Sequence, residues 1–156
     1  MALVSMAGRI QHVLFRPRAV SMDVEFAVPP RYYVSPENDG SISLWQFGFG
    51  VPFLNGSYGF ISLYPHTGSR PLDLGSDLER FRSAELAQAH SAGLVFREER
   101  MLVTRAGTAV CLAFSAGSRA KVACSLFKGP NVAVRFDGDT GRLADVYALV
   151  SSGHPI

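Results

Sequence analysis

Three short glycine-containing segments divide the region 94–152 into β-rich runs, and this pattern constrains the fold more than any other feature. The segments are 105–108, 116–119 and 128–131. Glycine-containing loops between runs rich in Val, Ala and aromatic residues are typical of β-hairpins. The sequence therefore predicts an antiparallel meander. Its predicted strands are 101–104, 109–114, 121–127 and 132–136.

The second of these turns predicts a register. A Gly117-Ser118 loop suits a type II′ turn, because Gly takes the positive φ at the first central position. Ala116 is then opposite Arg119, and Cys111 is opposite Cys124. One predicted sheet face carries Val110, Leu112, Phe114, Ala123, Ser125 and Phe127, joined by Val132, Val134 and Phe136. The other carries Ala109, Cys111, Ala113, Val122, Cys124 and Leu126.

Both predicted faces are largely apolar, so the sheet needs cover on both sides. Leu143, Val146, Tyr147 and Val150 have the i, i+3, i+4, i+7 spacing of one helix face, which predicts a helix over 143–152. We expect Asp139 or Thr140 to cap it. A second helix is predicted from a capping-box sequence at 76–79 to His90.

The N-terminal half predicts further strands. The residues from Val20 to Val28 alternate between apolar and polar side chains, which indicates a half-buried strand. Segments 13–15, 31–34, 41–49 and 58–64 are also predicted to be extended. Strands, helix, meander and helix in this order indicate an α+β fold, mainly an antiparallel sheet with helices packed on its faces.

The composition bounds the class of protein. With 156 residues, of which 47% are hydrophobic, we expect one α+β domain over 1–156. The 15 basic residues are scattered, so nucleic acid is not an expected partner. No apolar run approaches the roughly 18 residues of a membrane span. We also expect no signal peptide, two reduced buried thiols and a cytoplasmic location, although facing cysteines would also suit a cross-strand disulfide.

Residues with catalytic potential do not assemble into a clear set. The four histidines are dispersed, so neither a metal nor a cofactor is expected. Ser91, in the sequence Ala89-His90-Ser91-Ala92-Gly93, resembles the nucleophile elbow of α/β-hydrolases. An elbow needs a strand before the serine and a helix after it, and here a helix precedes Ser91. We therefore expect no enzyme, with a small hydrolase that uses Ser91 as the least favoured alternative.

An aromatic run broken by glycines gives the candidate binding site. Trp45, Phe49 and Phe53 lie in this run and are candidate anchors for a protein partner. Glu37 and Asp39 lie in the preceding polar turn and would steer a basic partner. The alternative is that these aromatic residues belong to the core.

The C-terminal half resembles small bacterial immunity proteins of the PsbP-like fold, an antiparallel sheet with helices on both faces. The resemblance covers about 94–152 and rests on the segments 124–127, 129–131, 134–138 and 145–150. It implies a non-enzymatic cytoplasmic protein that binds and neutralises a toxin delivered by type VI secretion. The alternative is a module with a pocket for a small apolar ligand between the sheet and a helix.

Overall fold

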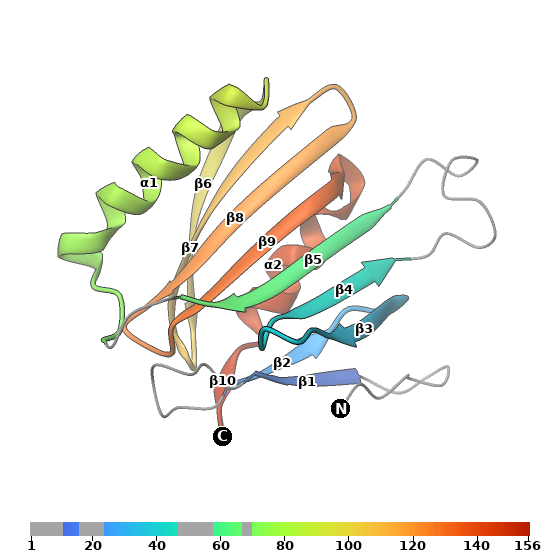
Figure 1. Cartoon of the computed structure of the whole chain (residues 1–156), viewed down its shortest axis with the longest axis vertical. Coiled ribbons are helices and arrows are strands. Elements are labelled where there is room, and N and C mark those ends of the chain that lie inside the picture. The colour runs from blue at the N-terminus through green and yellow to red at the C-terminus, as the bar shows by residue number, and fades with distance from the viewer. Residues whose placement is uncertain (1–10, 16–23, 47–57, 67–69) are drawn as a thin grey trace.

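A seven-stranded antiparallel sheet forms the centre of the molecule (Figure 1). The computed structural model describes residues 11–15, 24–46, 58–66 and 70–156. The strand order is β3-β4-β5-β9-β8-β7-β6. In that order the strands are β3 (Tyr32–Pro36), β4 (Ile42–Gln46), β5 (Gly59–Pro65), β9 (Val132–Asp139), β8 (Arg119–Phe127), β7 (Gly107–Ala116) and β6 (Val95–Thr104).

Two helices and a smaller sheet complete the described structure. Helix α1 (Leu74–Ser91) contacts β6, β7 and β8, and α2 (Leu143–Ser151) packs beside β2 on the opposite face (Figure 1). The smaller sheet has the order β1-β2-β10, from β1 (Gln11–Phe15), β2 (Val24–Val28) and β10 (His154–Pro155). The α+β class with a mainly antiparallel sheet is thus confirmed. No helix in the described part of the chain has both the length and the apolar character needed to cross a membrane.

The larger core lies between the sheet and α2. Val146, Tyr147 and Val150 of α2 are buried as the helical spacing predicted, together with the β2 side chains Val24 and Phe26. A smaller core lies under α1 and contains Ala89, Leu94, Leu112 and Phe114. Because neighbouring residues of a strand point to opposite faces, Cys111 belongs to the first core and Leu112 to the second.

The β7–β8 hairpin has the predicted register. Ala116 is opposite Arg119 and Cys111 is opposite Cys124. The two cysteines are disulfide bonded, with Cα atoms 4.1 Å apart. The expectation of two reduced thiols is therefore wrong, because this register places them in a closely spaced pair whose side chains meet. The cytoplasmic location loses the support that it drew from reduced thiols, and it stays a prediction.

Strand β9 presents its apolar residues to the face opposite to the predicted one. Cys124 is opposite Val134 and Val122 is opposite Phe136, so these valines and Phe136 join the core under α2. The predicted face corresponds to an even number of residues in the β8–β9 connection. In the observed register the last pair is Ser125 with Ala133, which encloses an odd number of residues, 126–132, and Lys128 among them adopts a positive φ of 58°. An odd connection exchanges the two faces of the following strand.

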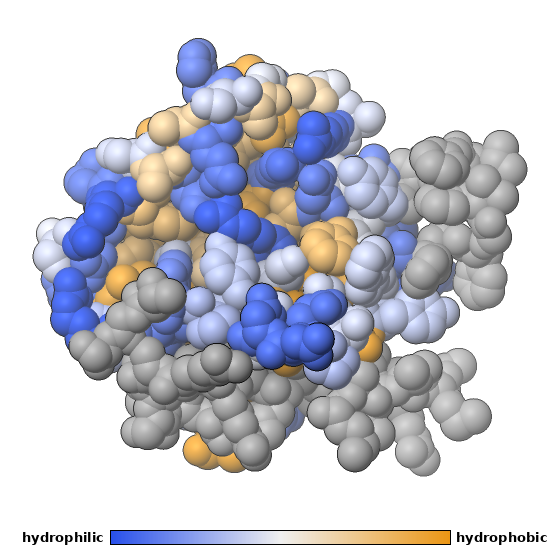
Figure 2. Space-filling view, in the orientation of Figure 1, coloured by the Kyte–Doolittle hydropathy of each residue, from blue (hydrophilic) through white to orange (hydrophobic). Residues whose placement is uncertain are grey.

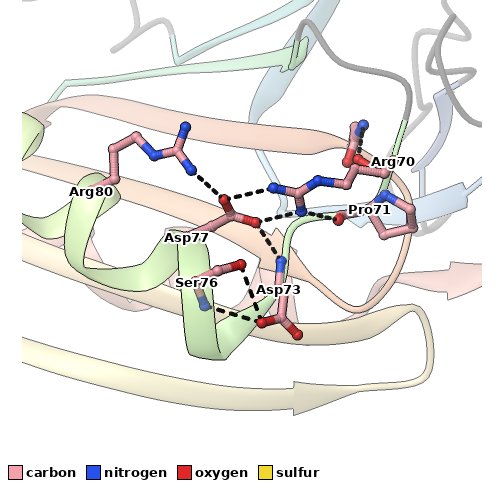
Figure 3. Close-up of polar contacts among 7 residues, drawn as sticks. Arg70, Pro71, Asp73, Ser76, Asp77 and Arg80 are labelled. Atoms are coloured by element: carbon pink, nitrogen blue, oxygen red, sulfur yellow. Dashed lines mark hydrogen bonds and ion pairs between the residues drawn. The ribbon is translucent and has the colours of Figure 1, made fainter.

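Helix α1 begins two residues before the predicted capping box. Asp73 is the cap, and its carboxylate accepts a hydrogen bond from the Ser76 amide at 3.0 Å. Asp77 returns the interaction by accepting from the Asp73 amide at 2.7 Å. Arg70 and Arg80 also donate to the Asp77 carboxylate (Figure 3). These charges hold the start of α1 to the segment that precedes it.

The predicted caps of α2 are wrong. Strand β9 continues to Asp139, and a 3₁₀ turn at Thr140–Arg142 leads into the helix without a side-chain cap. The Asp139 carboxylate instead accepts from the Tyr58 amide at 2.6 Å, which ties β9 to the start of β5. The helix itself ends one residue before the predicted limit.

Candidate functional site

One row of side chains crosses the whole α1 side of the sheet. The pairings of adjacent strands place Tyr33, Trp45, Phe60, Asp137, Lys121, Phe114 and Phe96 in this row. Aromatic residues stand at both ends and an acid–base pair stands in the middle. Helix α1 packs mainly over β6–β8 and reaches β9 through Glu85, so the two ends of the row have different surroundings (Figure 1).

Tyr33, Trp45 and Phe60 form an aromatic strip on the part of the sheet that α1 leaves open. Tyr33 is opposite Trp45, and the Trp45 ring meets the Phe60 ring edge-on with centroids 4.8 Å apart. Tyr33 is 46% exposed and Trp45 is 44% exposed. Their neighbours Tyr32 and Leu44 point to the α2 side and are buried. Strand alternation therefore puts one set of side chains in the core and the other set at the surface.

The structure places three of the five predicted site residues. Trp45 is in the aromatic strip, whereas Phe49 and Phe53 lie outside the described residues. Glu37 and Asp39 are exposed in the β3–β4 turn, where Asp39 Oδ1 accepts from the Ser41 amide at 2.9 Å. The turn and Trp45 share one hairpin. They are separated along it by about four residues, or roughly 13 Å.

A polar cluster that the sequence did not predict lies where α1 meets the open part of the sheet. The Arg135 guanidinium on β9 binds both carboxylate oxygens of Glu85 on α1, at 2.6 and 2.9 Å. It also donates to the Tyr64 hydroxyl on β5 and to Gln88 Oε1. Glu85 is buried, so this bidentate pair compensates a carboxylate that has lost most of its water.

His66 extends this cluster on the side of the β8–β9 turn. Its Nε2 lies 3.1 Å from the hydroxyl of buried Ser125. Burial, and next the nearby Arg135 guanidinium, lower the pKa of His66 from its ordinary value of 6.5. The imidazole is therefore neutral at pH 7. The Ser125 hydroxyl is buried in the core.

A groove of about 260 Å³ opens between α1 and strands β5, β9 and β8. Its lining includes the apolar Phe60, Ala92 and Phe114 and the charged Lys121, Arg135 and Asp137. Figure 2 shows this face, where hydrophobic side chains are visible among hydrophilic ones beside α1. A pocket for a small apolar ligand between the sheet and a helix was the alternative expectation, and this groove beside α1 has a lining of mixed character.

The charged middle of the row forms its own network. Asp137 lies 3.3 Å from Arg119 and 3.7 Å from Lys121, and the Tyr58 hydroxyl is 3.4 Å from the same carboxylate. Burial and the Asp137 charge raise the pKa of the Tyr58 phenol, so it stays protonated at neutral pH. This network separates the open aromatic strip from Phe114 under α1.

Ser91 does not have the setting of a nucleophile elbow. It is the last residue of α1, and its hydroxyl donates to the Ala87 carbonyl oxygen within the helix at 3.1 Å. His154, the histidine that follows Ser91 in the sequence, lies on β10, which pairs with β2 in the smaller sheet. Among the residues that the structure describes, no three His, Cys, Asp or Glu side chains form a group that suits a metal ion.

Comparisons with known proteins give no relative. No protein-family model matches the chain, and neither a curated protein nor a solved structure matches it. The resemblance to immunity proteins therefore stays an expectation. The site rests on the geometry of the chain itself.

Proposed function

We propose that this chain is a non-enzymatic protein-binding module and that its partner is a secreted bacterial toxin, which it neutralises by direct binding. The observation that carries the proposal is the exposure of Tyr33 and Trp45 on one face of a paired hairpin. The identity of the partner as a toxin rests on the resemblance of 94–152 to immunity proteins, and it is tested separately from binding.

The aromatic strip has the physical character of an interface anchor. Tyr and Trp bury a large area with only two side-chain torsions to fix, and they are enriched at binding hot spots. The pairings with β4 and β5 hold both residues on a formed sheet, so little ordering is needed when a partner binds. The ring of Phe60 already orients Trp45.

The charges near this hairpin favour a basic partner. Segment 36–41 carries Glu37 and Asp39 and no Lys or Arg. Both carboxylates are exposed, so they act on the rate of association more than on the final affinity. Their contribution should weaken as salt is added. The partner surface that meets the strip is thus an apolar pocket bordered by Lys or Arg.

A matched pair of variants tests the proposal with the product of the neighbouring gene as the candidate partner. Trp45 and Phe96 stand toward opposite ends of one row and are 44% and 45% exposed. Each meets one buried or half-buried ring edge-on. Trp45→Ser should lose about 2 kcal/mol or more of binding in calorimetry, whereas Phe96→Ser should bind like the wild type. Equal binding by both folded variants would place the interface elsewhere.

The same pair tests neutralisation. Cells that express the candidate toxin should survive with the wild type or Phe96→Ser and lose protection with Trp45→Ser. Glu37→Lys should slow association, and its effect should shrink at high salt. A partner that binds tightly but is not a toxin would retain the binding-module proposal and remove the immunity assignment.

The groove beside α1 supports a second candidate function, the binding of a small ligand. Its volume of about 260 Å³ is near the lower limit for ligand pockets, and it combines apolar walls with convergent charges. An Ala92→Phe variant would fill it from the exposed end of α1. Native mass spectrometry of protein purified from cells should then show a bound mass in the wild type that the variant lacks. A wild type without bound mass would count against this candidate.

A further inference from the structure

The outer strand β6 exposes large apolar side chains away from the aromatic strip. β6 is the last strand in the order of the large sheet, so one of its edges has no neighbouring strand among the described residues. Val103 is 85% exposed and Met101 is 57% exposed on this strand. Long edge strands with exposed apolar side chains are templates for pairing with another strand.

The disulfide pair shows which backbone groups face this open edge. Cys111 and Cys124, with Cα atoms 4.1 Å apart, form a non-hydrogen-bonded pair, so the amide and carbonyl of Cys111 point away from β8 and toward β6. Arg100, opposite Cys111, therefore bonds to β7. Alternation along β6 turns the backbone groups of Glu99, Met101 and Val103 outward.

Only part of the edge is suited to pairing. A bulge between Phe96 and Glu98 interrupts the regular ladder at the start of β6. Bulges are one of the devices that protect sheet edges. The stretch from Glu99 to Thr104 is regular and contains the apolar run Met101-Leu102-Val103, with no proline or lysine to block addition of a strand.

We propose that a second copy of this chain pairs with β6 through an antiparallel, two-fold symmetric edge contact centred on Leu102. Residues whose backbone groups face outward must pair with residues of the same kind in the second copy. The two-fold axis therefore passes through a residue and not between two residues. With Leu102 on the axis, Met101 is opposite the partner's Val103, and Glu99 is opposite the partner's Arg105. Apolar residues then meet in the centre and opposite charges meet at both ends.

Registers with the axis at Glu99, Arg100 or Met101 pair less well. An axis through Glu99 places two carboxylates opposite each other, and an axis through Arg100 does the same for two guanidinium groups. An axis through Met101 places Glu99 opposite an apolar Val103. Arg105 is exposed in the β6–β7 turn. Glu99 is bound to Arg82 at 2.5 Å but remains partly exposed, with 30% of its side chain accessible.

This contact does not use the aromatic strip. β3, with Tyr33, and β6 are the two opposite edges of the seven-stranded sheet. Pairing of two β6 strands would therefore produce a continuous sheet of two copies with an aromatic strip at each far end. Such an isologous contact closes on itself and leaves both strips available to partners.

Sedimentation analysis of the purified full chain tests the inference. We expect a concentration-dependent dimer for the wild type and a shift to the mass of one chain for Val103→Lys. Val95→Lys is the control, since Val95 is a 53% exposed valine of the same strand that lies beyond the bulge and outside the paired stretch. Val103 is so exposed that its replacement should leave the fold, checked by circular dichroism, unchanged.

A charge exchange tests the register. Arg105→Glu should weaken the dimer by at least tenfold, and Glu99→Lys combined with Arg105→Glu should restore it. A wild type that stays monomeric at every concentration would overturn the inference. A dimer that persists in Val103→Lys would overturn it as well, since it would have to form through another surface.

Discussion

The two halves of the large sheet carry the same kind of side chains but are covered differently. Strands β6–β9 lie between α1 and α2, and Leu112 and Phe114 on their α1 side are buried. Strands β3–β5 are covered on the α2 side, while Tyr33 and Trp45 on the α1 side are exposed. Within one row, Phe114 is thus a core residue under α1, whereas Tyr33 and Trp45 are surface residues beyond it.

This difference shows that hydrophobic character alone does not separate the core from an interface. The position of α1 decides which aromatic side chains are buried and which are exposed. The Arg135–Glu85 pair stands at the boundary between the two halves. On the covered side, loss of an apolar contact should destabilise the fold. On the open side, the same loss should affect binding.

The largest effect should come from charging the core under α2. Val150 is 3% exposed on the buried face of α2, and Val150→Asp would bury a carboxylate without a partner. We expect a loss of roughly 3 kcal/mol or more in the free energy of unfolding. Ala148→Asp, at an exposed position of the same helix, should change little. Similar urea denaturation curves for the two variants would show that α2 is not packed as described.

A smaller effect should follow from breaking the boundary pair. Arg135→Met would leave the buried Glu85 carboxylate without its bidentate partner. Because Arg135 is 41% exposed, solvent screens the pair, and we expect a loss of about 1–3 kcal/mol, less than for a fully buried pair. Adding Glu85→Leu should recover part of this loss in chemical denaturation. A double variant less stable than Arg135→Met would contradict the claim that Arg135 compensates the buried carboxylate of Glu85.

The anchor of α1 should respond to acid. Hydrogen bonds from Arg70, then from the Asp73 amide, together with the charge of Arg80, lower the pKa of Asp77 from 3.8 to about 2. A carboxyl group with a depressed folded-state pKa stabilises the fold above its unfolded pKa, and this stabilisation is lost as the pH falls toward 2.

The control for this effect is Asp77→Asn, which cannot ionise. Thermal unfolding of the wild type should lose stability between about pH 4 and pH 2, and the variant should show a flatter profile in that window. Identical pH profiles would mean that the two arginines and the Asp73 amide do not depress the pKa of Asp77.

Local patterns were sufficient to predict several elements. The Gly117-Ser118 turn gave the register of β7 with β8, and the apolar spacing of 143–150 gave the buried face of α2. Each prediction depended on residues close in sequence. The exposure of Trp45 was left open as one of two alternatives, since a β-strand pattern does not say which of its faces a distant helix covers.

Other features depended on geometry that leaves little trace in the sequence. Strand β9 turns its apolar residues to the α2 side because an odd number of residues separates the last paired positions of β8 and β9. Lys128 in this stretch adopts a positive φ without a glycine to signal it. Arg135 and Glu85 are 50 residues apart and meet only because α1 crosses the sheet. The sequence signal for this pair is Arg135 itself, a charged residue in the apolar run 132–136. Such a residue indicates that a half-buried strand position has an oppositely charged partner.

The unfolding free energies of Trp45→Ala and Phe114→Ala test the central comparison most directly. Both residues belong to the same row, but Trp45 is 44% exposed and Phe114 is 3% exposed. We predict a loss of about 3–5 kcal/mol for Phe114→Ala and of about 1 kcal/mol or less for Trp45→Ala, measured by urea denaturation. Equal losses in the two variants would mean that Trp45 belongs to the folding core, which would contradict the assignment of the aromatic strip as a binding surface.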